Sequence, residues 1–209
     1  GRAGIDDVLI VERSDALGGT WHHNRYPGCA VDIPTHVYSF SFAPNPDWGR
    51  SYSEQPEIQA YLRRVAEESG VLDRFRFGTA VEDATWDDDA QHWRVVTSAG
   101  TVTADLLVSA AGALSDPKMP DIDGIETFQG EVFHSARWDH DVDLSGKRIA
   151  VIGTGASAVQ LVPELQQVAA ASGGHVDVYQ RTPNWIIPRN ERSFTALEKA
   201  VFKKVPGAQ

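Results

Sequence analysis

The sequence predicts an α/β fold with two Rossmann-like dinucleotide-binding domains and a small antiparallel β meander, truncated at both ends. Residues 8–11 form a short apolar run, as in a buried parallel strand. Residues 149–151 form a second apolar run, which leads into a glycine-containing turn. Between these runs, residues 75–110 alternate with the period of two that is typical of antiparallel strands.

The composition indicates an ordinary globular protein. The chain has 209 residues, of which 42% are hydrophobic and 23% are charged. A net charge of -10 argues against nucleic acid or an anionic membrane as a partner. The sequence has neither an apolar run of 18 residues nor a signal-peptide pattern, and its single cysteine, Cys29, excludes an internal disulfide. We therefore expect a soluble, cytoplasmic protein, and the sequence leaves its oligomeric state open.

Glu12 follows the first apolar run and is the first candidate ligand-binding residue. An acid at this place in a dinucleotide fold accepts hydrogen bonds from ribose hydroxyls, although an isolated acid is more commonly a surface charge. The following segment "GGTW", residues 18–21, favours the ligand-binding interpretation. The glycine turn that should precede Glu12 by about 20 residues is not in the chain. We therefore expect the chain to start inside its first nucleotide unit.

The clearest predicted helix covers residues 53–70. Ser53 can cap its N-terminus, Pro56 fits its first turn, and Gly70 can end it. One apolar stripe runs along it at helical spacing: Ile58, Tyr61, Leu62 and Val65. The preceding residues 21–48 are irregular and rich in proline, so they need another element to hold them. After the meander, residues 106–109 are expected to form a buried strand.

The strongest local motif starts at Gly153. Glycine at this position permits a tight turn, and Gly155 lets the backbone approach a pyrophosphate at a helix N-terminus. Ala158 is small enough for close packing between helix and strand. Such a pattern also occurs by chance as a structural loop, but its position between two predicted strands favours a nucleotide turn. Pro163 interrupts the following helix without an evident reason in the sequence.

Gln180 and Arg181 end the next predicted strand, where an NAD site usually presents an acid. An arginine at this place can instead bind the 2′-phosphate of NADP. The alternative is a solvated charge at the end of a strand. The geometry favours NADP.

Five segments together resemble a known family: "LGGTW", "NRYPGCAVDIPTHVYSFSF", "SAAGALSDPKMP", "FQGEVFHSARWD" and "VIGTGASAVQ". They are similar to the single-component, flavin-dependent Baeyer–Villiger monooxygenases. Residues 128–139 match the fingerprint of that family, Phe-x-Gly-x-x-x-His-x-x-x-Trp followed by Pro or Asp. The resemblance extends over essentially all of the chain and over the N-terminal part of such an enzyme. It implies a partial FAD-binding domain at 1–127, a hinge linker at 128–145 and a partial NADP-binding domain at 146–209.

The resemblance implies cofactor contacts from both domains. For FAD the implied residues are Glu12, Gly19, Thr20, Trp21, Asp32, Tyr38 and Val81. For NADP they are Gly153, Thr154, Gly155, Ala156, Ser157, Ala158, Val159, Gln180 and Arg181. Ala30 to Asp32 would also face the nicotinamide. The two implied catalytic residues are Asp32, which would position a cationic group beside the flavin, and His134, which would help to control domain movement.

The implied reaction uses FAD, NADPH and O₂ to insert one oxygen atom into a ketone, which gives an ester or a lactone. The cofactor carries the chemistry, while the protein orients and shields it. The arginine that the family places beside the flavin has no matching position before residue 209, so the site is incomplete in this chain. We therefore expect the chain alone to be inactive and neither to fold stably nor to retain FAD. The identity of the ketone stays open.

Several alternatives remain. A related flavin monooxygenase that oxidises nitrogen or sulfur tends to carry Tyr or Phe in place of Trp138. A noncatalytic dinucleotide-binding module or an inactive truncated product is also open, and a disulfide reductase is weaker because Cys29 has no CxxxxC partner. The sequence predicts no metal site, since His22, His23, Cys29 and His36 follow no usual zinc spacing. Ser157 lacks the flanking glycines of a hydrolase nucleophile.

Overall fold

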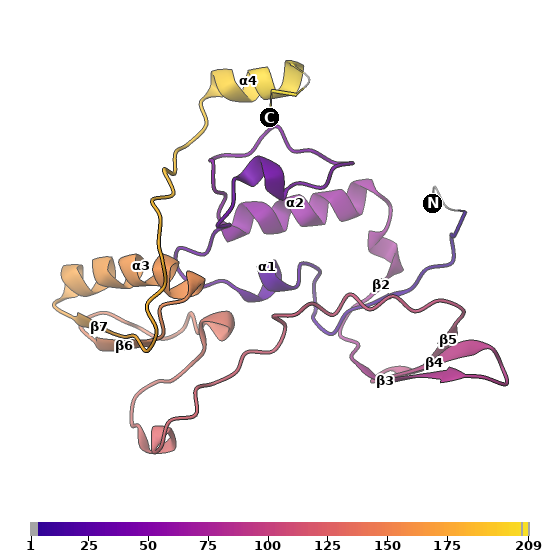
Figure 1. Cartoon of the computed structure of the whole chain (residues 1–209), viewed down its shortest axis with the longest axis horizontal. Coiled ribbons are helices and arrows are strands. Elements are labelled where there is room, and N and C mark those ends of the chain that lie inside the picture. The colour runs from indigo at the N-terminus through magenta and orange to yellow at the C-terminus, as the bar shows by residue number, and fades with distance from the viewer. Residues whose placement is uncertain (1–3, 206, 209) are drawn as a thin grey trace. The chain divides into compact units, whose positions relative to one another are not determined.

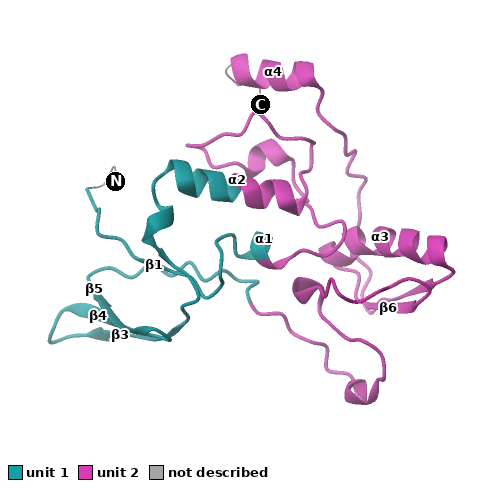
Figure 2. Ribbon diagram, turned by 180° about the vertical axis from the view of Figure 1, so that it is seen from behind, with its two compact units in different colours: residues 1–22, 62–115 teal, residues 23–61, 116–209 magenta. Residues whose placement is uncertain are grey.

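A computed structural model describes residues 4–205 and 207–208 and divides the chain between two units. Unit 1 contains residues 1–22 and 62–115, and unit 2 contains residues 23–61 and 116–209 (Figure 2). Three small sheets and four α-helices make up the regular structure of the described residues (Figure 1). Two of the sheets are pairs of parallel strands and the third is antiparallel. The predicted α/β class with a small antiparallel meander is therefore confirmed.

The first parallel pair lies in unit 1 and is shorter than predicted. β1 (Ile10–Val11) pairs with β2 (Phe75–Arg76). β2 directly follows the 3₁₀ turn η2 (Leu72–Arg74). The prediction of a buried strand over residues 8–11 is wrong in extent and in burial, because Val8 and Leu9 are 42% and 43% exposed. The physical reason is that β1 has a strand neighbour on one side only among the described residues.

The antiparallel meander is confirmed in unit 1. It consists of β3 (Val81–Asp87), β4 (His92–Thr97) and β5 (Gly100–Ala104), in that spatial order. Cross-strand pairing places the rings of Trp86 and Trp93 edge to face, with 5.7 Å between their centroids. Aromatic pairs of this geometry stabilise a hairpin beyond the area that they bury.

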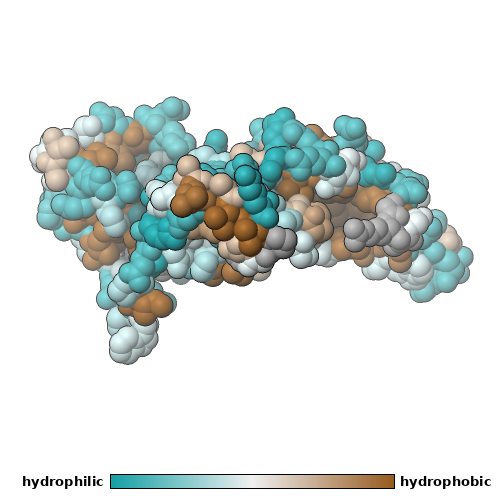
Figure 3. Space-filling view, turned by 90° about the horizontal axis from the view of Figure 1, so that it is seen from above, coloured by the Kyte–Doolittle hydropathy of each residue, from teal (hydrophilic) through white to brown (hydrophobic). Residues whose placement is uncertain are grey.

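The buried strand predicted at residues 106–109 is wrong. This segment has no regular structure, and Leu106 and Val108 are 72% and 85% exposed. A parallel strand becomes stable only when its backbone groups pair with a neighbour. Within the described residues nothing pairs with this segment, so its apolar side chains lie at the surface. Apolar residues are also interspersed among hydrophilic ones on the face that Figure 3 shows.

The clearest predicted helix is α2 (Gln55–Glu68). Its predicted stripe is buried at Ile58, Tyr61 and Val65 and half-buried at Leu62. Gly70 ends it in a left-handed conformation, with φ of 66°. The predicted cap at Ser53 is wrong. The N–H of Ser53 donates to Thr35 Oγ1, and its carbonyl oxygen accepts from the N–H of Val31. The buried Ser53 hydroxyl has no hydrogen-bond partner.

The irregular residues 34–48, which include the 3₁₀ turn η1 (Thr35–Tyr38), are held by the first turns of α2 within unit 2. The Tyr61 hydroxyl donates to the carbonyl oxygen of Ala43 at 2.8 Å and accepts from the N–H of Phe40 at 2.7 Å. Trp48 is fully buried against the ring of Tyr61, with 5.0 Å between their centroids. The predicted need for a supporting element is therefore met by α2.

The second parallel pair lies in unit 2 and carries the glycine turn. β6 (Arg148–Ile152) is followed by α3 (Ala156–Ser172) and then by β7 (His175–Tyr179), which pairs with β6 in parallel. α3 buries Leu161, Leu165 and Ala169. The predicted strand–helix–strand unit is confirmed. Short elements complete the described chain: α1 (Thr20–His23), η3 (Ile125–Thr127), η4 (Ser135–Arg137) and α4 (Ala196–Lys204).

Candidate functional site

The turn after β6 has the geometry of a nucleotide-binding turn. Gly153 has a φ of 103°, which favours glycine, and its N–H donates to the carbonyl oxygen of Tyr179 at 2.9 Å. Gly155 precedes the first residue of α3, and no side chain caps that helix. A Cβ at either glycine would meet no atom within 4 Å. The helix N-terminus therefore leaves space for an anionic group.

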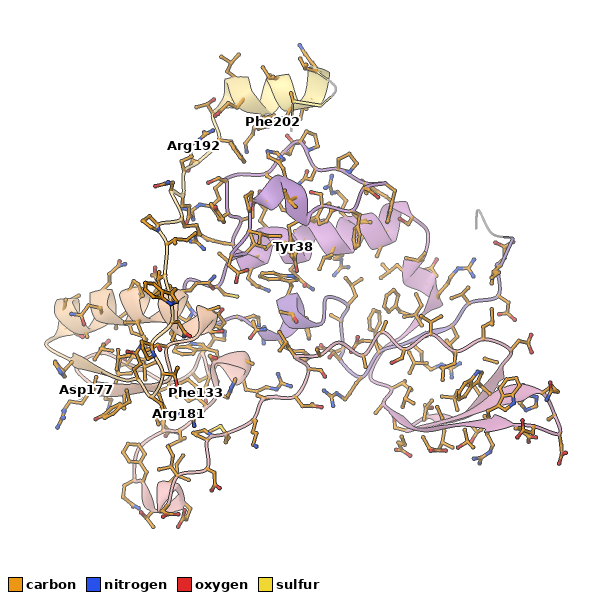
Figure 4. The ribbon with its side chains drawn as sticks, viewed as in Figure 1. Tyr38, Phe133, Asp177, Arg181, Arg192 and Phe202 are labelled. Carbon is orange, nitrogen blue, oxygen red and sulfur yellow. The ribbon has the colours of Figure 1, made fainter. Side chains whose placement is uncertain are left out.

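Two side chains hold the residue between these glycines. Gln180 Nε2 donates to Thr154 Oγ1 at 2.9 Å, and Asn184 Nδ2 donates to the carbonyl oxygen of Thr154 at 2.7 Å. Both come from the segment that follows β7, so the carboxyl ends of β6 and β7 are tied together. Arg181 is exposed and lies in the same segment (Figure 4).

A cleft of about 880 Å³ in unit 2 combines this turn with the segment that carries Asp32. Its volume lies in the range of about 300–1,000 Å³ that is typical of ligand sites. Six of the sequence-predicted residues line it: Ala30, Asp32, Thr154, Gly155, Ala156 and Val159. Gln160 of α3 lines it as well, together with Asn184, Trp185 and Arg189 from the segment after β7. The structure therefore brings Asp32 and the nucleotide turn to one cavity.

The other predicted FAD-binding residues lie in unit 1, except for Tyr38, which lies in unit 2. Glu12 directly follows β1, and its Oε1 accepts a hydrogen bond from the N–H of Ser14 at 2.8 Å. Gly19 has a φ of 51° and precedes α1, which begins with Thr20 and Trp21. Val81 is the first residue of β3 and is 51% exposed. A carboxylate at the end of a parallel strand suits a ribose, as the sequence predicted.

The fingerprint segment in unit 2 contains a local fold of its own. His134 precedes η4, and its Nδ1 accepts a hydrogen bond from the N–H of Ala136 at 3.0 Å. The His134 imidazole is thus fixed against its own backbone. The rings of Phe133 and Trp138 meet edge to face, with 5.0 Å between their centroids.

Tyr38 lies outside this segment. It ends η1 and is 38% exposed.

Across the described ranges, 4–205 and 207–208, no group of three or more His, Cys, Asp or Glu side chains could hold a metal ion. The same ranges contain no helix that is both long and apolar enough to cross a membrane.

Comparison with known proteins decides the family. A family model described as flavin-binding monooxygenase-like matches residues 4–196. The chain belongs to the flavin-binding monooxygenase-like family. It is 51% identical over 205 residues to a Baeyer–Villiger monooxygenase of Streptomyces coelicolor, an alignment that covers 98% of this chain and 39% of the relative. The predicted resemblance is therefore confirmed.

Solved structures of this flavin-binding monooxygenase-like group have the same fold. One, the enzyme OTEMO in complex with FAD and NADP, superposes with a TM-score of 0.87 at 36% identity and covers 97% of this chain. Another, the closed form of a cyclohexanone monooxygenase, gives a TM-score of 0.83 at 35% identity and covers 93%. This chain covers 39% and 37% of those two chains.

Three residues at the site of this flavin-binding monooxygenase-like chain were not found by sequence reasoning: Gln160, Asn184 and Tyr26. Gln160 lies two residues after the glycine motif, and a polar residue on the packed side of a helix would have been a usable signal. Tyr26 is 7% exposed, and burial raises the pKa of its hydroxyl to about 12, so this group stays a hydrogen-bond donor at neutral pH. Asn184 carries no such signal in the sequence.

Proposed function

We propose that this protein is an FAD- and NADPH-dependent monooxygenase that inserts one oxygen atom of O₂ into a ketone to give an ester or a lactone. The observation that carries the proposal is that Asp32, Thr154 and Gly155 line the same cleft. Family membership and the Baeyer–Villiger relatives support the reaction class. The bound complex of the neighbouring OTEMO structure supports the cofactor pair.

The residues of unit 2 fit the phosphate groups of NADPH. The uncapped start of α3 offers backbone N–H groups to the pyrophosphate, and Gly153 and Gly155 leave room for it. Arg181 would bind the 2′-phosphate, and Thr154, fixed by Gln180 and Asn184, would shape the turn. Ala156, Ser157, Ala158 and Val159 complete the proposed NADP contacts.

The residues of unit 1 suit contacts with FAD. Glu12 would accept hydrogen bonds from the adenosine ribose, and Val81 would contact the adenine side. Thr20 and Trp21 would line the flavin, and Gly19 would also contact the cofactor. From unit 2, Asp32 and Tyr38 would lie beside the flavin. When bound, FAD and NADPH supply the electrons and the oxygen chemistry. Asp32 would hold a cationic group in place, because a carboxylate next to a cation lowers the energy of both charges.

We also propose the domain layout of 1–127, 128–145 and 146–209, with the middle segment as a hinge. The bond from the Ala136 N–H to His134 supports a fixed ring orientation in that segment. The family resemblance, and not this bond, implies that His134 influences domain movement rather than proton transfer to the substrate.

The decisive experiment expresses the complete open reading frame that encodes this chain, with FAD. NADPH, ¹⁸O₂ and a panel of linear, cyclic and aromatic ketones and sulfides are then supplied, and products are followed by mass spectrometry. We expect esters or lactones that carry one labelled oxygen atom, and the Asp32→Ala variant should form far less of them. Sulfoxides without any ester would assign the protein to the N- or S-oxygenating class. No NADPH-dependent product at all would contradict the proposal.

A further inference from the structure

The Gln160 side chain joins α3 to the segment that carries Asp32. Its partners there are Tyr26 and Ala30, which lie far from it in the sequence. Its Oε1 accepts hydrogen bonds from the Tyr26 hydroxyl at 2.9 Å and from the Ala30 N–H at 3.2 Å. Its Nε2 donates to the carbonyl oxygen of Ala30 at 2.9 Å. One carboxamide thus binds both backbone groups of Ala30, which a side chain does only when its position is closely matched to that backbone.

A glycine allows this close approach. Gly28 has a φ of 79°, and a Cβ at this position would lie 2.7 Å from the carbonyl oxygen of Gln160 and 3.0 Å from Cγ of Glu164. Real Cβ atoms do not approach a backbone oxygen so closely, so the segment contacts α3 only because residue 28 has no side chain. The neighbouring Ala30 and Val31 are buried, with 7% and 1% exposure.

The same segment is held on its other sides by groups outside α3. The N–H of Val31 donates to the carbonyl oxygen of Ser53 at 3.0 Å, and Arg189 Nη1 donates to the carbonyl oxygen of Val31 at 3.1 Å. Gln160 is therefore the side chain of α3 that binds the backbone of this segment, while Ser157 of the same helix also interacts with Tyr26. Thr154 and Gly155 lie at the start of that helix, and Asp32 is two residues beyond Ala30.

We infer that Gln160 is a positioning residue that sets Asp32 relative to the nucleotide turn, and so holds the nicotinamide of NADPH and the Asp32 carboxylate in the relation that hydride transfer needs. This inference rests on the proposed function. Gln160 lines the same cleft, and it acts on Asp32 through the backbone of Ala30, which it binds. Small displacements of reacting groups lower rates far more than they lower binding, because rate depends steeply on orientation.

The test uses the complete open reading frame expressed with FAD. The rate of flavin reduction by NADPH is measured anaerobically in a stopped-flow instrument, and the Kd of NADP⁺ is measured by titration. For Gln160→Ala we expect the reduction rate to fall about tenfold, from lost hydrogen bonds and lost orientation. The Kd should change by less than about threefold, since the phosphate contacts remain. Gln160→Glu keeps the two bonds that Oε1 accepts, so its reduction rate should lie between those of the unchanged protein and Gln160→Ala.

Gln167→Ala is the matched control, because Gln167 is exposed on the same helix, and it should leave both quantities unchanged. If Gln160→Ala does not fold, Tyr26→Phe removes one of the three bonds to Gln160 at little cost in volume and should slow reduction in the same direction. Ser157→Ala removes the interaction of Tyr26 with Ser157 separately and serves as its control. A reduction rate in the folded variants equal to that of the unchanged protein would overturn the inference. So would a Kd that rises as much as the rate falls.

The two proposals fail in different ways. If the unchanged protein is not reduced by NADPH, the proposed function is wrong and the inference falls with it. If it is reduced but forms no ester, only the assigned product class is wrong. Normal reduction in the unchanged protein and in Gln160→Ala would contradict the role of Gln160 alone.

Discussion

The imidazole of His36 meets the ring of Phe202 edge to face, with 4.6 Å between their centroids, and thereby joins η1 to α4 (Figure 4 labels Phe202). Phe194 lies on the same imidazole at 5.0 Å. Both ring nitrogens are buried and have no hydrogen-bond partner. Burial lowers the pKa of His36 below its ordinary value of 6.5. The folded state therefore favours the neutral ring.

Acid should weaken this contact. With the folded pKa lowered, the unfolded state binds more protons once the pH falls below about 6.5, so the contribution of His36 is complete above that value and declines as the pH falls toward the folded pKa. The charged groups beside the cluster are Arg192 over Phe194, and Asp47 paired with Lys203. We expect faster hydrogen exchange in α4 at pH 5.5 than at pH 7.5, after correction for intrinsic rates. His36→Phe should abolish the difference, and His175→Gln, at an exposed histidine, should preserve it.

α4 should depend on its capping box. Thr195 Oγ1 accepts from the N–H of Glu198 at 3.2 Å, and Glu198 Oε2 accepts from the N–H of Thr195 at 2.8 Å. Thr195→Ala should cost about 1 kcal/mol of local helix stability, measured by hydrogen exchange in α4. Thr195→Ser keeps the hydroxyl and should behave as the unchanged protein; equal exchange in both variants would contradict a role for the cap.

The carboxylate of this box should tolerate mild acid. Hydrogen bonds from Arg192 and from Thr195 lower the pKa of Glu198 to about 2. Its contribution is therefore present above the ordinary value of 4.5 and is lost only as the pH falls toward about 2. In the His36→Phe variant, exchange in α4 should accordingly stay unchanged between pH 7.5 and 5.5. A rise in that range would contradict this assignment.

The core of unit 2 should be most sensitive at Trp48. This side chain is fully buried, and its Nε1 donates to Ser39 Oγ at 3.1 Å. Trp48→Ala should lower the free energy of unfolding by about 3–5 kcal/mol, because it opens a large cavity under residues 34–48. Urea unfolding of the complete protein measures this change. Trp185→Ala is the control, since Trp185 is 102% exposed and should cost little in stability.

Local patterns in the sequence predicted those elements whose partners are close in the chain. The meander and the β6–α3–β7 unit need only neighbouring residues, so their periodicity and glycines were sufficient. The glycine turn at Gly153 followed from the same motif. Asp32, which lines the same cleft as Thr154 and Gly155, was predicted from family resemblance. No local sequence pattern connects Asp32 with residues so distant in the chain.

The failed predictions depend on distant partners. Residues 106–109 read as a buried strand, yet a strand needs a neighbour, and their apolar content alone cannot supply one. Ser53 has the right residue type for a cap, but its backbone is bonded to Val31 and Thr35, so the chain enters α2 one residue later. Gln160 was overlooked because its three bonds reach Tyr26 and Ala30, which only the tertiary fold places beside it.

Arg181 should decide between the two pyridine nucleotides. It follows β7 and Gln180 at the edge where the glycine turn lies, and its side chain is exposed and accessible to a phosphate (Figure 4). A charge-assisted hydrogen bond contributes about 1.5–3 kcal/mol, so Arg181→Ala should weaken NADP⁺ binding about ten- to hundredfold. NAD⁺ has no 2′-phosphate, and its Kd should stay nearly constant.

Arg148→Ala provides the matched control for this prediction. Arg148 carries the same charge and is also exposed, but it begins β6, at the end of the strand away from Gly153. Its removal tests whether a general loss of positive charge weakens NADP⁺ binding. Fluorescence titration of both nucleotides with both variants measures the four affinities. If Arg181→Ala weakens NADP⁺ and NAD⁺ equally, or if Arg148→Ala has the same effect, Arg181 is a solvated charge and the 2′-phosphate is bound elsewhere.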